Sequence, residues 1–191
     1  MVARIALAFL IIAIPLFVGA CAGRSQTAQQ PEAHTPIWRS QLRERALLLL
    51  AEAARDENAL VRANALEGLA PVPMRARPFV FDALTDRNLG VRYAGAMLAG
   101  RLALPDAAPL LRDLQSDADA SVRAASIYAL SALRQPVDPG PLATMLLDGD
   151  VRTRAQAAFI LGEMGNRSAV PLLREALMRP APNARLSDVR L

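Results

Sequence analysis

Few side chains in this sequence have the types and the spacing that catalysis or metal binding requires. The 191 residues include one cysteine, Cys21, and one histidine, His34. A single cysteine rules out an intrachain disulfide and a thiolate metal cluster, and a single histidine removes most zinc sites. The serines and threonines have no nearby base, and the sequence has no glycine-rich phosphate loop. We therefore expect a protein that is not an enzyme, with no catalytic residue, cofactor or metal site.

The charged residues that do recur are aspartate and arginine at a fixed spacing. In four segments an Asp is followed by four residues, then by Val or Thr, then by Arg. The four pairs are Asp56 and Arg62, Asp86 and Arg92, Asp117 and Arg123, and Asp148 and Arg154. The arginines lie 30, 31 and 31 residues apart, which indicates an internal repeat. One interpretation of the column is an arginine track that binds phosphates.

The residues around each pair predict a helix, a turn that begins with the Asp, and a second helix. Counted from the Val or Thr, apolar or small residues fall at offsets 0, 4, 7, 8 and 11, which is one stripe of a 3.6-residue helix. In the second copy these are Val91, Gly95, Leu98, Ala99 and Leu102. Offset 4 is small in every copy, as expected where two backbones approach closely. Another apolar stretch precedes each Asp and supplies the first helix.

Composition agrees with an all-α chain. Apolar residues make up 53% of the sequence but aromatic residues only 4%, which suits closely packed helices better than a β-sandwich. The formal charge is +4, which is too small to indicate nucleic acid by itself. A pair of short helices cannot bury its own apolar face, whereas stacked pairs form a continuous core.

The repeated motif resembles the HEAT-repeat family, in particular the short bacterial repeats of the phycobilisome-lyase type. The resemblance implies an α-solenoid of about four and a half helix pairs over residues 37–191, with an incomplete last repeat. The expected fifth Val-Arg is Val189-Arg190, in which Arg190 lies 36 residues after Arg154 and directly before Leu191. We expect this end to be truncated or completed by a partner. In the family, the Asp and Arg positions tie one repeat to the next, which gives the structural ladder interpretation.

The first 36 residues predict an exported, anchored chain. Residues 1–20 read as a signal peptide, with Arg4 before a long apolar run. Val18-Gly19-Ala20-Cys21 resembles the bacterial lipobox, which implies lipidation of Cys21. Residues 21–36 are a polar tether. An uncleaved membrane anchor and a plain secreted protein are the alternatives. Ala22 after the cysteine favours, by the same resemblance, an outer-membrane location facing the periplasm.

A candidate partner surface lies on the second helices, opposite the apolar stripe. Offsets 2 and 6 point away from the predicted core, and they carry Tyr93, Met97, Tyr128 and Phe159. Aromatic residues and Met are enriched in protein interfaces, so these residues could form a binding row. The competing interpretation is that they pack between adjacent repeats.

Together these features predict a lipid-anchored envelope scaffold that mediates protein–protein interaction through a helical-repeat surface. We expect an unidentified protein partner and membrane attachment through the lipid, with no small-molecule substrate. The alternatives are a chromophore-lyase-like accessory enzyme, or arginine-mediated nucleic-acid binding if the chain is not exported. For an exported chain we expect no nucleic-acid partner.

Overall fold

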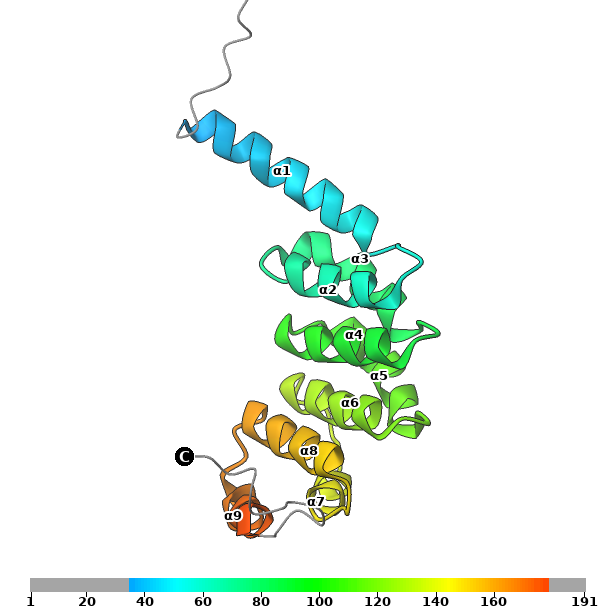
Figure 1. The fold of residues 1–191 in the computed structure, drawn as a ribbon, viewed down its shortest axis with the longest axis vertical. Helices are drawn as coiled ribbons and strands as arrows, with labels where there is room; N and C mark the ends of the chain where they lie inside the picture. Colours follow the sequence, from blue (N-terminus) through cyan, green and yellow to red (C-terminus); the bar gives the residue numbers. More distant parts are fainter. Residues whose placement is uncertain (1–34, 179–191) are drawn as a thin grey trace, which may run out of the picture. The chain divides into compact units, whose positions relative to one another are not determined.

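The computed structural model describes residues 35–178, and every regular element in that range is helical. The predicted all-α solenoid class is therefore confirmed for this part of the chain (Figure 1). The α-helices are α1 (Pro36–Ala53), α2 (Ala59–Leu69), α3 (Pro73–Leu84), α4 (Leu89–Arg101), α5 (Ala108–Asp113), α6 (Ala120–Ala132), α7 (Gly140–Leu146), α8 (Val151–Glu163) and α9 (Val170–Met178). Short 3-10 helices are η1 (Pro105–Ala107), η2 (Leu114–Ser116) and η3 (Arg167–Ala169).

The chain divides into two units, residues 1–39 and residues 40–191. Of the first unit only residues 35–39 are described. Thr35 precedes α1 and residues 36–39 form the start of this helix, where the Trp38 backbone N–H donates to Thr35 Oγ1 at 3.2 Å. The segment predicted as a signal peptide lies outside the described residues, and so do Cys21, His34, Val189 and Arg190. Within residues 35–178, no helix is both long enough and apolar enough to cross a membrane.

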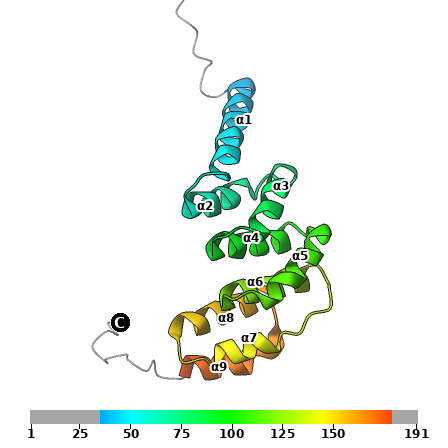
Figure 2. The same ribbon diagram turned by 90° about the vertical axis from the view of Figure 1, so that its right-hand side faces the viewer.

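The second unit is a stack of helix pairs. The first helices of the pairs are α1, α3, α5, α7 and α9, and the second helices are α2, α4, α6 and α8. The second helices pack on one another in chain order, α2 on α4, α4 on α6 and α6 on α8 (Figure 2). Helix α9 is the first helix of a fifth pair, as the sequence predicts.

The apolar stripe of each second helix forms the core of the stack. All four residues at offset 8 are buried: Leu69, Ala99, Leu130 and Leu161. In the first copy α2 ends at Leu69, two residues before Pro71, which cannot continue the helix. The close approach predicted at offset 4 is confirmed at Gly95, where an added Cβ would lie 2.8 Å from the Cβ of Ala83. Only a residue without a side chain lets α3 and α4 meet at this distance.

Candidate partner-binding site

The turn that joins the two helices of a pair has the same hydrogen bonds in all four copies. Oδ1 of the repeat Asp accepts the backbone N–H of the residue two positions later, at 2.7 to 2.9 Å. That later residue is the N-cap of the second helix, and its side chain accepts one or two N–H groups of the first turn. The four N-caps are Asn58, Asn88, Asp119 and Asp150. From the sequence, the repeat Asp is expected at the start of this turn, but the N-caps are not identified, although they recur at the repeat spacing.

The repeat arginine is held in this turn by two backbone carbonyls. In the third copy, Nη1 of Arg123 donates to the carbonyls of Asp117 at 2.7 Å and Ala118 at 3.0 Å. Arg62, Arg92 and Arg154 make the same pair of bonds in their own turns. In Arg62 and Arg92 the other edge of the guanidinium, Nε and Nη2, points toward the next pair in the stack.

In the first two copies that edge binds the repeat Asp of the next pair. Arg62 donates from Nε to Oδ2 of Asp86 at 2.8 Å and from Nη2 to Oδ1 at 2.7 Å. Arg92 binds Asp117 in the same way, at 2.7 Å and 3.0 Å. The hydrogen bond from Arg92 is the main reason that the pKa of Asp117 is lowered from its usual value of 3.8. We call these two-bond contacts the closed rungs of the Asp–Arg ladder.

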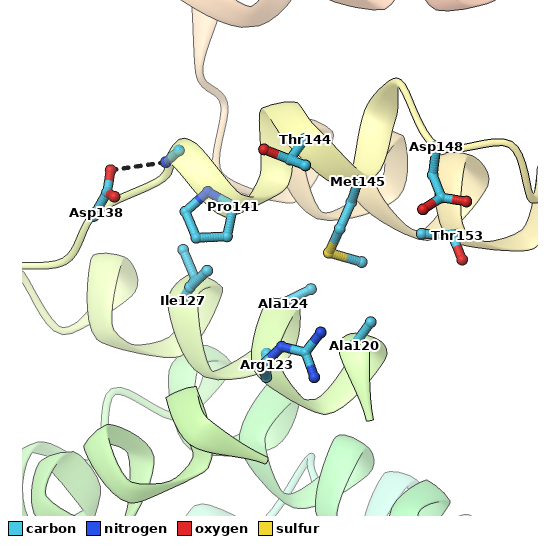
Figure 3. Close-up of a pocket in the computed structure, with 11 residues that line it drawn as sticks. Ala120, Arg123, Ala124, Ile127, Asp138, Pro141, Thr144, Met145, Asp148 and Thr153 are labelled. Atoms are coloured by element: carbon cyan, nitrogen blue, oxygen red, sulfur yellow. Dashed lines mark hydrogen bonds between the residues drawn. The ribbon is translucent and has the colours of Figure 1, made fainter. Parts of the chain in front are cut away.

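The third rung is open. Arg123 and Asp148 are 25 residues apart, the same separation as Arg92 and Asp117. Among the described residues, however, no carboxylate accepts a hydrogen bond from Nε or Nη2 of Arg123. A cleft of about 590 Å³ lies between α6 and α7 instead. Figure 3 shows Arg123 on the α6 side of this cleft and Asp148 on the opposite wall, where α7 leads into α8.

The walls of this α6–α7 cleft are partly apolar and partly charged. Its apolar lining is Ala120, Ala124, Ile127, Pro141 and Met145. Its polar lining, apart from Arg123 and Asp148, is Asp138, Thr144 and Thr153, with the backbone of Gly140. Oδ1 of Asp138 is already engaged, since it accepts the Gly140 N–H at 2.8 Å. The cleft therefore offers one arginine edge, two carboxylates and a patch of aliphatic surface.

Of the two interpretations of Tyr93, Met97, Tyr128 and Phe159, packing between helices holds at Met97 and Tyr128, and the exposed binding row is wrong at these two positions. Met97 and Tyr128 are only 2% and 7% exposed, because α4 and α6 have helices packed on several sides. The Tyr128 ring lies against Gly100, where an added Cβ would be 2.7 Å from Cε1. Tyr93 is half-buried, and its hydroxyl accepts a hydrogen bond from Nε2 of Gln156 at 2.8 Å. Phe159 is 51% exposed and is the one member of the row that presents most of its side chain to solvent.

Other candidate chemistry is limited in the part of the chain that the structure describes. Residues 35–178 contain no group of three or more His, Cys, Asp or Glu side chains placed to hold a metal ion. In the closed rungs, Nε and Nη2 of Arg62 and Arg92 bind aspartates of this chain, so these atoms are not available to bind phosphate. The predicted lipidation of Cys21 stays a prediction, since that residue is not described.

Comparisons with known proteins agree with the repeat. A family model for HEAT repeats matches residues 46–131, and a model for the PBS lyase HEAT-like repeat matches residues 153–177. A comparison with curated proteins gives no match. HEAT repeats generally mediate protein–protein interactions. The two HEAT models together cover more than half of the chain, and both fall on the stacked helix pairs, so the chain belongs to the HEAT-repeat proteins.

Proposed function

We propose that this HEAT-repeat chain is a lipid-anchored scaffold of the bacterial cell envelope that binds a protein partner through its helical-repeat unit. The observation that carries the proposal is the continuous core across successive pairs. The closed rungs join the first three pairs, and α4 and α6 are buried over Ala94–Gly100 and Ala124–Leu130. A core of this kind holds the exposed surfaces of the stack in fixed positions, which suits recognition of a partner.

The anchor rests on the sequence of the first 21 residues. The apolar run before Val18-Gly19-Ala20-Cys21 supports export and lipidation at Cys21. A polar tether of about 15 residues would span roughly 20 Å as a flexible coil, which separates the repeats from the lipid headgroups. The proposed location is the outer membrane, on its periplasmic face.

Mass spectrometry of the N-terminal peptide from isolated membranes tests the anchor. We expect a mature chain that begins at Cys21 and carries a diacylglyceryl group, and we expect Cys21→Ser to leave the membrane fraction. A chain that retains Met1, or one without lipid on Cys21, would contradict this part of the proposal.

Photocrosslinking in cells tests the scaffold. A photoreactive amino acid is placed in turn at exposed positions on different faces of the repeat unit, for example Phe159, Arg112 and Met74. We expect at least one face to give a discrete adduct with another protein, and the remaining faces serve as controls. If every exposed position gives only the uncrosslinked chain, the scaffold proposal fails.

The PBS lyase HEAT-like match is compatible with the accessory-enzyme alternative, but it covers only α8 and α9, residues 153–177. A match of this length supports the fold of these two helices more than a lyase activity. Absorbance titration of the purified chain with a linear tetrapyrrole distinguishes the two: saturable binding would favour the alternative.

A further inference from the structure

We infer that the α6–α7 cleft is a binding site for a carboxylate side chain of the protein partner, and that Arg123 receives it. This inference rests on the proposed scaffold function and deepens it, since it names the chemistry of the partner. The partner segment would be a short acidic peptide with an aliphatic residue beside its Glu or Asp. In this site the partner's carboxylate takes the place that Asp148 would occupy in a closed third rung.

The first argument is the geometry of Arg123. Its Nη1 is fixed by the carbonyls of Asp117 and Ala118, just as Nη1 of Arg92 is fixed by the preceding turn. Two arginines held in this way, Arg62 and Arg92, bind a carboxylate through Nε and Nη2. Arg123 lines the α6–α7 cleft, and among the described residues no carboxylate binds its Nε–Nη2 edge, which is the edge that makes a planar, two-bond contact in Arg62 and Arg92. The chain itself thus contains two examples of the contact that we assign to the partner.

The second argument is the size and lining of the cleft. About 590 Å³ lies within the range of sites that enclose small ligands, and is ample for two side chains of a peptide. Across the cleft, Pro141 lies opposite Ile127, and Met145 lies opposite Ala124, on the side of Arg123 (Figure 3). An aliphatic side chain next to the partner's carboxylate would bury apolar surface there. The cleft can therefore contact both side chains of such a peptide: the carboxylate through Arg123 and the aliphatic side chain through the apolar lining.

The third argument concerns the two carboxylates that line the cleft. Asp138 and Asp148 both disfavour an incoming anion, so an acidic segment gains from the site only through direct contact with Arg123. The two are not equivalent, because only Asp148 stands at the repeat position that closes a rung. Asp148 is therefore a competitor for the same arginine edge, whereas Asp138 acts only through its charge.

A peptide array tests the site. Acetylated and amidated nonapeptides with a central Glu or Asp between Leu or Ile residues are compared with the same peptides carrying Gln or Asn. The full chain is the labelled probe, and Kd values of the strongest peptides follow from fluorescence anisotropy. We expect acidic peptides to bind, and we expect Arg123→Gln to weaken them by about tenfold or more, as loss of a charged two-bond contact implies.

Matched variants separate direct contact from general electrostatics. Asp148→Asn and Asp138→Asn each remove one negative charge from the cleft, and we expect Asp148→Asn to tighten binding more. Arg154→Gln controls for loss of the two turn bonds, since Arg154 makes the same bonds, to the carbonyls of Asp148 and Gly149, but does not itself line the cleft. Circular dichroism checks that each variant is helical.

Three outcomes would overturn the inference: equal binding of the acidic and amide peptides, unchanged binding by a folded Arg123→Gln chain, or no binding by either wild type or Asp148→Asn. The scaffold proposal is judged separately. If photocrosslinks to a partner form equally well in Arg123→Gln, the scaffold stands and the assigned site is wrong.

Discussion

The difference between the closed and open rungs can be measured as a difference in coupling free energy. Arg92 and Asp117 share two charged hydrogen bonds, and their side chains are 18% and 8% exposed. Arg123 and Asp148 occupy the same positions one pair later without such bonds. Each residue in both pairs also makes bonds within its own turn. A double-mutant cycle cancels those turn bonds and leaves the contact between the two side chains.

The expected magnitudes follow from burial. Exposed ion pairs contribute about 0 to 1 kcal/mol, whereas removal of one partner of a buried pair costs about 3 to 5 kcal/mol. The Arg92–Asp117 rung is largely buried and doubly bonded, so we expect a coupling of about 2 kcal/mol. For Arg123 and Asp148 we expect less than about 0.5 kcal/mol, because their side chains do not meet. Arg123→Ala alone should still lower stability by about 1 kcal/mol, through loss of its two carbonyl contacts.

Urea denaturation followed by circular dichroism at 222 nm gives the unfolding free energies of the wild type, the four single Ala variants and the two double variants. Equal slopes with urea concentration show that the variants unfold in the same way. If the open rung couples as strongly as the closed one, the cleft is not the prevailing conformation in solution, and the reasoning about Arg123 is refuted.

Three further predictions concern the closed rung and the buried aromatic position. Because the pKa of Asp117 is lowered in the folded state, its carboxylate stabilises the fold above about pH 4, and this stabilisation should be lost as the pH falls through the folded-state pKa. The urea midpoint should therefore decrease as the pH is lowered, and it should decrease less in Arg92→Ala. Gly100→Ala should destabilise by about 2 kcal/mol in thermal melts, since its Cβ would clash with Tyr128. Tyr128→Ser should cost about 3 kcal/mol, whereas Phe159→Ser should melt close to wild type; equal losses would contradict their burial.

The repeat itself was predictable because its physics is local. A stripe at offsets 0, 4, 7, 8 and 11 fits one face of a helix, and a small residue at offset 4 permits close packing. Both depend on a few neighbouring residues, and both are confirmed, for example at Gly95 and Leu130. The N-caps were missed although they obey the same local logic: Asn58 and Asn88 recur at the repeat spacing.

The aromatic row could not be placed in the same way. A helical wheel separates one core-facing side from its opposite, but it does not decide whether that opposite side is exposed or packs against an adjacent repeat. In this stack α4 contacts α2, α3 and α6, so its far side is also covered. Met97 and Tyr128 are therefore core residues. How many faces of a helix are buried depends on the neighbours of its pair, which the sequence of the helix itself does not specify.

The open rung has its cause in the segment between the repeat positions. The spacing of Arg123 and Asp148 matches that of a closed rung, so the motif alone predicts closure. The connector between α6 and α7, Leu133–Pro139, is seven residues long, contains two prolines and has no 3-10 helix, whereas the last three residues of the six-residue connector between α4 and α5 form η1. Helix length does not explain the difference, because α5 has six residues and precedes a closed rung, whereas α7 has seven. Each turn thus orients its arginine, but contact with the next aspartate depends on how closely the following helix packs. Shortening this connector, and not altering the motif, is therefore the change that should close the third rung.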